Sequence, residues 1–174
     1  MTQKRTNIGL IGFMGTGKTT IGSALAEFLD WTFCDTDDIV ESRAGKTISQ
    51  IFSDEGEAAF RELECVVVKE VCNLETTVIS FGGGAPLDPV NRRLIEKNSF
   101  VVLLKASAST IIARTSGSTE RPLLNVHEGQ LENKVNLLLN ERNLTYKEIM
   151  DFELETDDLS VEEAVTRIVE RLKL

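Results

Sequence analysis

Apolar residues along this chain form short unbroken runs, separated by stretches in which they recur every three or four positions. Residues 7–11, 31–34, 77–80 and 100–104 are such runs and predict strands, and the last is typical of a strand covered on both faces. Within residues 21–29 the apolar positions follow i, i+3, i+4 and i+7, which indicates an amphipathic helix. Strands that alternate with helices predict an α/β protein with a parallel sheet.

Polar residues and a glycine mark the expected helix ends. Thr47 and Gln50 have the spacing of a capping box ahead of an apolar pair, and Ser160 and Glu163 have the same spacing before the last helix. Gly45 is placed to end a short helix, because glycine adopts the left-handed conformation common there.

The rest of the pattern is less regular. A longer helix is expected from about residue 55, and another through residues 131–142. Residues 152–155 alternate between apolar and polar, which predicts a more exposed strand. From residue 115 to residue 125 the apolar periodicity fails, and we predict a mobile loop there.

The length and charge of the chain limit the number of domains and the kinds of partner to expect. The 174 residues contain no repeat or long linker, so we expect one domain spanning residues 1–174. No apolar stretch approaches the roughly 20 residues of a membrane span, and no leader segment is apparent, so we expect a cytoplasmic protein without a membrane partner. The 28 acidic and 19 basic residues give a net charge of −9, which disfavours nucleic acid as a partner. An anionic ligand must therefore meet locally placed cations.

The cysteines and the histidine do not suggest a reactive site. Cys34, Cys65 and Cys72 are odd in number and form no Cys-x-x-Cys pair, which argues against a disulfide framework or a zinc site and for a reducing compartment. We predict that they are packing residues. His127 has no catalytic partner nearby in sequence and is expected on the solvent side of a loop.

The stretch GFMGTGKT at residues 12–19 matches the phosphate-binding pattern G-x-x-x-x-G-K-[ST] between a predicted strand and a predicted helix. Its glycines let backbone N–H groups point at phosphates, and the helix N-terminus adds partial positive charge. Lys18 can reach the β and γ phosphates, and the Thr19 hydroxyl is a ligand for Mg²⁺. We predict that the nucleotide is held by Gly15, Thr16, Gly17, Lys18, Thr19 and Thr20.

This loop alone does not separate kinases from GTPases or motor ATPases. Guanine-specific switches usually carry an Asn-Lys-x-Asp segment after a strand. The nearest match, residues 133–136, lacks the aspartate and falls within a predicted helix, so a switch is disfavoured.

Carboxylates and glycines follow two other predicted strands, at the edge where ligands of parallel sheets collect. Asp35 and Asp37 can serve different tasks, one orienting hydrated Mg²⁺ and the other accepting a proton from an attacking hydroxyl. The alternative is helix capping by Asp37 or Asp38. The glycines at residues 82–84 are either a plain turn or a place where a ligand approaches the backbone.

Three arginines are candidates for binding anions, and each has an alternative. Arg61 lies beside a core phenylalanine, but its spacing also allows a surface ion pair with Glu57 or Glu64. Arg121, in the polar loop, is either a solvated charge or a lid arginine that reaches the transferring phosphoryl group. Arg142 is either a ligand or a charge on a helix surface.

Taken in order, these segments resemble shikimate kinase. The resemblance spans essentially the whole chain and is more specific than the phosphate loop. It is carried by GFMGTGKTT, FCDTDDIVE, GEAAFRELE, VISFGGG, ERPLL and the later ER followed by Tyr146. Residues 142–151 depart from the family, which usually has a proline-leucine pair before the tyrosine and an alanine near Ile149.

The resemblance implies a fold and an activity. The fold is that of P-loop nucleoside-triphosphate kinases, in three layers, with a five-stranded parallel sheet in the order 2-3-1-4-5 and flanking helices. An acceptor-binding segment is implied at about residues 37–64 and a mobile lid at about residues 115–125. The implied reaction transfers the γ-phosphate of ATP to the 3-hydroxyl of shikimate, with Mg²⁺ as cofactor, in aromatic amino acid biosynthesis. We expect a monomer.

On the acceptor side, the resemblance assigns four roles. Asp37 matches the residue that binds the shikimate hydroxyls and is the candidate base. Arg61 and Arg142 match the arginines that grip the substrate carboxylate, and Gly82, Gly83 and Gly84 match the glycines that line the pocket.

On the nucleotide side, Asp35 matches the residue that helps to hold Mg²⁺ through water, and Ser80 matches a hydroxyl residue near the metal. Arg114 matches the arginine lying against adenine. Arg121 matches the lid arginine near the phosphates, where it and Lys18 supply positive charge for catalysis.

Other classes fit the residues less well. Gluconate kinases usually have a histidine soon after the Asp-x-Asp pair, and this chain has none there. Nucleoside monophosphate kinases have a different lid pattern. A regulatory module that has lost catalysis is disfavoured by the presence of Lys18, Thr19, Asp37 and Arg121.

Overall fold

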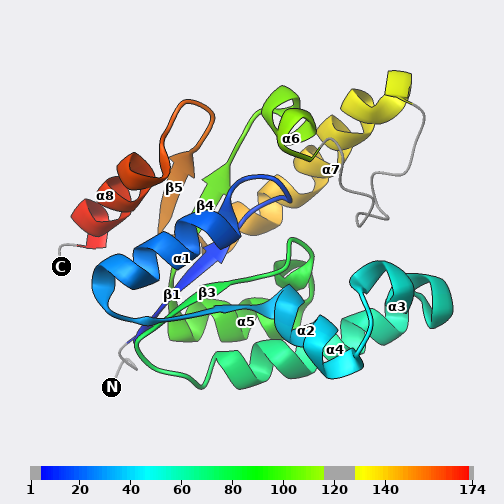
Figure 1. Ribbon diagram of the computed structural model, residues 1–174, viewed down its shortest axis with the longest axis horizontal. Coiled ribbons are helices and arrows are strands. Elements are labelled where there is room, and N and C mark those ends of the chain that lie inside the picture. The colour runs from blue at the N-terminus through cyan, green and yellow to red at the C-terminus, as the bar shows by residue number, and fades with distance from the viewer. Residues whose placement is uncertain (1–4, 116–127, 173–174) are drawn as a thin grey trace.

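The chain folds around a five-stranded parallel sheet (Figure 1). The computed structural model describes residues 5–115 and 128–172. The strand order is β2-β3-β1-β4-β5, as the family resemblance implied, and each neighbouring pair is parallel. The strands are β1 (Asn7–Ile11), β2 (Thr32–Asp35), β3 (Thr77–Ser80), β4 (Ser99–Lys105) and β5 (Phe152–Glu155).

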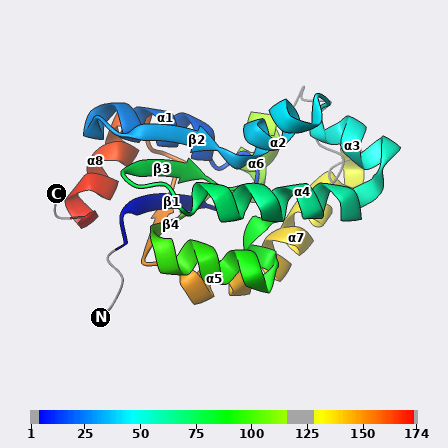
Figure 2. The same cartoon turned by 90° about the horizontal axis from the view of Figure 1, so that it is seen from below.

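Helices cover both faces of the sheet. Residues of α1 and α8 pack in one core cluster and residues of α4 and α5 in the other, so these two pairs of helices cover opposite faces. In Figure 1, α4 and α5 lie at the bottom of the view, and Figure 2, seen from below, shows them in front. The short helices α2 and α3 extend beyond the carboxyl ends of the strands. The helices are α1 (Lys18–Leu29), α2 (Thr36–Ala44), α3 (Ile48–Asp54), α4 (Gly56–Val71), α5 (Pro89–Asn98), α6 (Ala108–Thr115), α7 (Glu128–Ile149) and α8 (Val161–Leu172), with a 3₁₀ turn η1 (Ala85–Leu87).

The core is divided by the sheet because successive strand side chains point to opposite faces. Val102 and Leu104 of β4 pack in the cluster that contains residues of α1 and α8, whereas Val101 and Leu103 pack in the cluster of α4, α5 and the end of α7. The apolar run of β4 is therefore buried on both sides, as its sequence predicted.

The predicted helix ends are confirmed. At α3, Gln50 N–H donates to the Thr47 hydroxyl and Thr47 N–H donates to the Gln50 side chain. Ser160 and Glu163 make the same reciprocal pair before α8. Gly45 ends α2 with a φ of 64°. Each of these contacts supplies partners for backbone groups that a helix end leaves unpaired.

Two predicted boundaries were wrong by a single residue. The second strand is β2, Thr32–Asp35, rather than residues 31–34, because Asp35 is still in register with Ser80 of β3. Thr115 belongs to α6 rather than to the loop, and its buried hydroxyl donates to Ile111 O at 2.7 Å. Residues 116–125 of the predicted lid, with Arg121, lie outside the described residues, as does His127.

The three cysteines are free thiols. Cys72 is buried in the core below the sheet and Cys34 packs against it, as predicted. Burial raises the pKa of the Cys34 thiol to about 11 and that of Cys72 to about 12, which keeps both protonated near neutral pH. Within the residues described, no helix is both long enough and apolar enough to cross a membrane.

Candidate active site

The phosphate-binding loop joins β1 to α1 and depends on glycine. Gly12, Gly15 and Gly17 have φ values of 143°, 77° and 97°, a region that other residues adopt at a cost. A Cβ at Gly12 would also overlap the carbonyl oxygen of Leu104. Inside the turn, the buried Thr16 hydroxyl donates to Phe13 O at 2.8 Å. The sequence thus fixes a loop that only these glycines permit.

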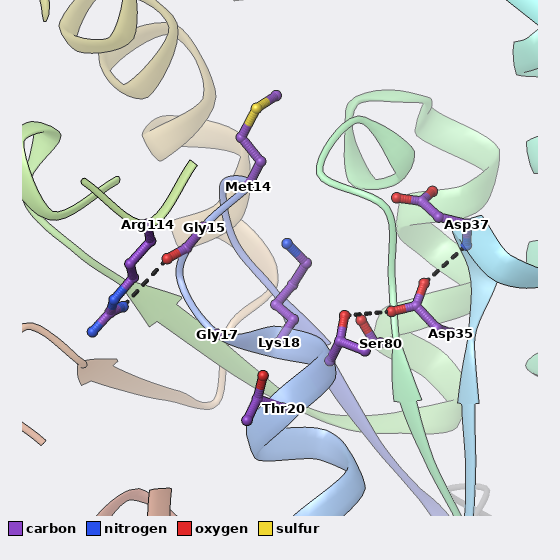
Figure 3. Close-up of a pocket in the computed structure, with 10 residues that line it drawn as sticks. Met14, Gly15, Gly17, Lys18, Thr20, Asp35, Asp37, Ser80 and Arg114 are labelled. Carbon is purple, nitrogen blue, oxygen red and sulfur yellow. Dashed lines mark hydrogen bonds between the residues drawn. The ribbon is translucent and has the colours of Figure 1, made fainter. Parts of the chain in front are cut away.

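Lys18 begins α1 and extends into a cavity of about 430 Å³ between the loop and the ends of β2 and β3 (Figure 3). Its ammonium donates to Gly12 O and Phe13 O, each at 3.0 Å. The cavity is lined by Met14, Gly15, Gly17, Lys18, Thr19, Thr20, Asp35, Asp37, Ser80 and Arg114. Five of the six predicted phosphate ligands, all but Thr16, and the two predicted aspartates therefore line one cavity.

Asp35 connects the loop to α2. Its Oδ2 accepts from the Thr19 hydroxyl at 2.8 Å, and its Oδ1 accepts from Asp37 N–H at 3.0 Å, which makes Asp35 the N-cap of α2. The alternative that Asp37 or Asp38 caps this helix is wrong. Ser80, buried at the end of β3, is the register partner of Asp35 and lines the same cavity.

Asp37 faces the cavity from the first turn of α2. Its pKa is raised to about 7, chiefly by burial and secondarily by the negative charge of Asp35, while Lys18 opposes the shift. A carboxyl group with a pKa near neutrality can accept a proton at physiological pH and hold it more tightly than an ordinary aspartate.

The three glycines after β3 lie against the predicted acceptor ligands. A Cβ at Gly82 would lie 2.5 Å from Asp37 Oδ1, and one at Gly83 would lie 3.4 Å from Arg142 Nη1. A Cβ at Gly84 would lie 2.6 Å from Arg61 Nη2. Asp37, Arg61 and Arg142 come from α2, α4 and α7, and this glycine run brings them together. It is more than a plain turn.

Arg61 forms ion pairs with both Glu57 and Glu64, the two partners that its spacing in the sequence allowed. Its guanidinium donates to Glu64 Oε2 at 2.7 Å and to Glu57 Oε1 at 3.1 Å. It is nevertheless partly buried and lies 5.1 Å from the centre of the Phe60 ring. Arg61 is thus an intrahelical ion-pair partner that also borders the glycine run.

Arg142 is not a surface charge. It is 6% exposed, and its guanidinium lies 5.2 Å from the centre of the Phe13 ring. One turn later, the buried Tyr146 hydroxyl donates to Gly83 O at 2.5 Å. Tyr146 thus joins α7 to the glycine run, even though residues 142–151 lack the family's usual proline-leucine pair.

Sequence reasoning missed the position of Glu64. This carboxylate is 1% exposed, and its Oε1 has no hydrogen-bond partner among the described residues. Burial raises its pKa, while Arg61 and Arg142 lower it. The spacing of three residues from Arg61 identified the ion pair but not the burial of Glu64. A Cβ at Gly82 would lie 3.0 Å from Glu64 Oε1, so the glycine leaves room for this carboxylate.

A second hollow, of about 200 Å³, lies on the other side of the loop and includes Arg114 and Thr156. Arg114 donates to Gly15 O at 3.3 Å, to Thr156 Oγ1 at 3.0 Å and to Thr156 O at 2.7 Å. Figure 3 shows the contact between Arg114 and Gly15. Thr156, directly after β5, carried no signal in the sequence.

Comparison with known proteins gives this geometry a family. The sequence model described as shikimate kinase matches residues 14–173. The chain belongs to the shikimate kinase family. It is accordingly an ATP-dependent kinase of the P-loop fold.

Individual relatives agree. The shikimate kinase of Pelotomaculum thermopropionicum is 40% identical over 96% of this chain and 95% of its own, and that of Caldicellulosiruptor bescii is 44% identical over 94% and 93%. A solved shikimate kinase from Acinetobacter baumannii, in complex with shikimate, matches with a TM-score of 0.93 at 36% identity over 97% of this chain and 93% of that chain.

Proposed function

We propose that this kinase transfers the γ-phosphate of ATP to the 3-hydroxyl of shikimate, giving shikimate 3-phosphate and ADP for chorismate and aromatic amino acid biosynthesis. The observation that carries the proposal is the meeting of Asp37, Arg61 and Arg142 at residues 82–84, with Lys18 across the same cavity from Asp37. A carboxylated polyol offers groups that suit each of these side chains.

The two arginines select the acceptor. Arg61 and Arg142 would hold its carboxylate, and each charge-assisted hydrogen bond contributes about 1.5–3 kcal/mol. These local cations overcome the net charge of −9 on the chain. Gly82, Gly83 and Gly84 leave room for the ring because side chains there would fill the space beside the arginines and Asp37.

Asp37 orients the acceptor hydroxyl and accepts its proton as the oxygen attacks the γ-phosphorus. Its raised pKa, about 7, suits this exchange because the carboxylate is present at neutral pH and binds the proton firmly as it is released. Lys18, at the other side of the cavity, neutralises charge on the transferring group.

The nucleotide phosphates would lie on Gly15, Thr16, Gly17, Lys18, Thr19 and Thr20. Mg²⁺ would be held by the Thr19 hydroxyl and, through water, by Asp35, and it neutralises phosphate charge when bound. The oxygens of these two side chains already lie 2.8 Å apart. Mg²⁺ keeps several waters and binds phosphate oxygens, so one hydroxyl and one carboxylate that acts through water suit it as protein ligands.

Further assignments follow from the resemblance. Arg114 would lie against adenine, and Arg121 would approach the phosphates from a lid at residues 116–125. Residues 37–64 would form the acceptor-binding segment of a single domain, acting as a monomer. We also infer a cytoplasmic location, which the three unpaired cysteines support because thiols persist in reducing compartments.

An acceptor panel tests the function. The purified chain is supplied with Mg·ATP and, separately, with shikimate, gluconate or a nucleoside monophosphate, and ADP release is followed. We expect release that depends on shikimate, with the product identified as shikimate 3-phosphate. Turnover with gluconate or a nucleoside monophosphate, and none with shikimate, would refute the assignment.

A further inference from the structure

The hydroxyl of Thr156 lies at the junction of three parts of the nucleotide site. Thr156 follows β5 and is 2% exposed. Its Oγ1 lies 3.0 Å from Thr16 O in the phosphate-binding loop and 3.0 Å from Lys105 O at the end of β4. The same oxygen accepts from Arg114 Nη1 at 3.0 Å. Because an Arg guanidinium only donates, the hydroxyl hydrogen points toward the two carbonyls.

These contacts fix the direction of a peptide plane. In a planar trans peptide, the C=O and the following N–H point in opposite directions, and no cis bond occurs among the described residues. The Thr16 carbonyl is directed at Thr156, so the Gly17 N–H is directed away from Thr156, toward the other side of the loop. Gly17 lines the cavity entered by Lys18, whereas Thr156 lines only the second hollow.

Arg114 acts on the preceding peptide in the same way. Its Nη1 donates to Gly15 O, which directs the N–H of Thr16 to the opposite side of that peptide. The hydroxyl of Thr156 accepts from the same guanidinium nitrogen, while Thr156 O accepts from Nη2. Two successive loop peptides are thus oriented by one pair of side chains.

We propose that Thr156 is a positioning residue for nucleotide binding. Its hydroxyl holds the Thr16 carbonyl directly, and it helps to place Arg114, which holds the Gly15 carbonyl, so that the Gly17 and Thr16 amides face the phosphates. This rests on the proposal that nucleotide phosphates lie on this loop. Glycine makes the loop mobile in φ, so an external clamp has more effect here than in a stiffer turn. Because these contacts order the loop before the phosphates bind, binding loses less conformational entropy.

Two pairs of variants isolate the hydroxyl. Thr156→Val replaces the hydroxyl by a methyl group of similar shape. Thr156→Ala and Thr156→Ser both lack the Thr methyl group, and only Ser keeps the hydroxyl. The backbone contacts from Thr156 N–H to Lys105 O at 2.8 Å and from Arg114 to Thr156 O do not involve the side chain. Thr166→Val is a matched control, because its exposed hydroxyl donates only to Glu162 O of its own helix in the described structure.

Binding is measured by calorimetry with Mg·ADP and with inorganic tripolyphosphate, which has no base. We expect the loss of the hydroxyl to raise both dissociation constants about 3- to 10-fold, the range for one hydrogen bond. Thr156→Ser and Thr166→Val should stay within about twofold of the native chain on the same scale. In turnover, the KM for ATP should rise while kcat and the KM for the acceptor change little. If Thr156→Val does not fold, the Ala and Ser variants give the same comparison.

Three results would overturn the proposal. One is unchanged affinity for both probes after loss of the hydroxyl, even with a lowered melting temperature. Another is an equal loss in Thr156→Ser. The third is a loss for ADP without one for tripolyphosphate, which would assign Thr156 to the nucleoside. Failure of the native chain to bind either probe would instead contradict the proposed nucleotide site.

Discussion

At the scale of single residues, the proposed proton transfer depends on one carboxyl group whose burial disfavours its charge. Asp37 lies near Asp35 and Glu64, whose charges raise its pKa in addition to the larger effect of burial. Asp35 is engaged by Thr19 and by the first turn of α2. The two aspartates are separated by one residue, yet Asp35 binds Thr19 and the start of α2, whereas Asp37 faces the cavity with a raised pKa.

Replacing Asp37 by Asn should lower kcat at least about 10²-fold, because the amide keeps the shape but does not accept the proton. Mg·ATP affinity should remain nearly unchanged. Native kcat/KM for shikimate should rise with pH through an apparent pKa near 7, since the base must be ionised, and this rise should vanish in the variant. Steady-state ADP release across pH 5.5–9 provides the measurement.

The matched control is Asp38→Asn, which removes the same charge from the next residue. Asp38 is exposed and does not line the cavity that contains Lys18 and Asp37. Its kcat should stay within a few fold of the native value. If Asp37→Asn has the same kcat as the native chain, Asp37 does not take part in the chemical step.

Arg61→Ala should chiefly weaken acceptor binding. We expect the KM for shikimate to rise about 10- to 100-fold, which corresponds to the loss of about one charge-assisted hydrogen bond, while the KM for ATP changes little. Arg43→Ala is the control, because Arg43 is an exposed partner of Glu70. Kinetics with each substrate varied in turn measure both constants. A defect confined to the KM for ATP would show that the arginine is misassigned.

At the scale of secondary structure, local signals predicted most of the fold. The strands, the two capping boxes and the glycine end of α2 were recognisable because their causes lie within a few residues of sequence. Glu64 and Thr156 were not, because a surface-spaced glutamate and an isolated threonine acquire their roles only when distant segments pack beside them. Arg142 was named from the resemblance, but its burial against Phe13 is a tertiary feature.

The two capping boxes offer a comparison between helices. Thr47→Ala and Ser160→Ala should each lower the free energy of unfolding by about 1 kcal/mol, since each removes a side-chain acceptor at a helix start. Thr47 caps α3, which lies in the proposed acceptor-binding segment, whereas Ser160 precedes α8, outside that segment. Only the Thr47 variant should therefore also raise the KM for shikimate. Urea unfolding and steady-state kinetics test this. Equal effects of both variants on that KM would show that α3 does not order the acceptor site.

At the scale of the whole molecule, the sheet determines which residues meet. The loop after β1 and the ends of β2 and β3 converge at one edge because the three strands are adjacent and parallel. Lys18, Asp35 and Ser80 therefore share a cavity although they are far apart in sequence. The other two proposed acceptor ligands, Arg61 and Arg142, come from α4 and α7, which contribute to the same core cluster on one side of the sheet.

The same arrangement has a cost in stability that depends on pH. The folded-state pKa of Asp37, about 7, lies above its ordinary value of 3.8, so the folded chain binds this proton more tightly than the unfolded chain. The associated stabilisation is complete below about pH 4 and is lost as the pH rises through 7.

Asp37→Asn has no such proton to lose. Its melting temperature should therefore exceed that of the native chain by several degrees at pH 8 and by less at pH 5, whereas the exposed Asp158→Asn should show no such pH-dependent gain. Calorimetric melting of the three proteins at both pH values tests this. If the gain in melting temperature of Asp37→Asn is larger at pH 5 than at pH 8, the folded protein does not raise the pKa of Asp37.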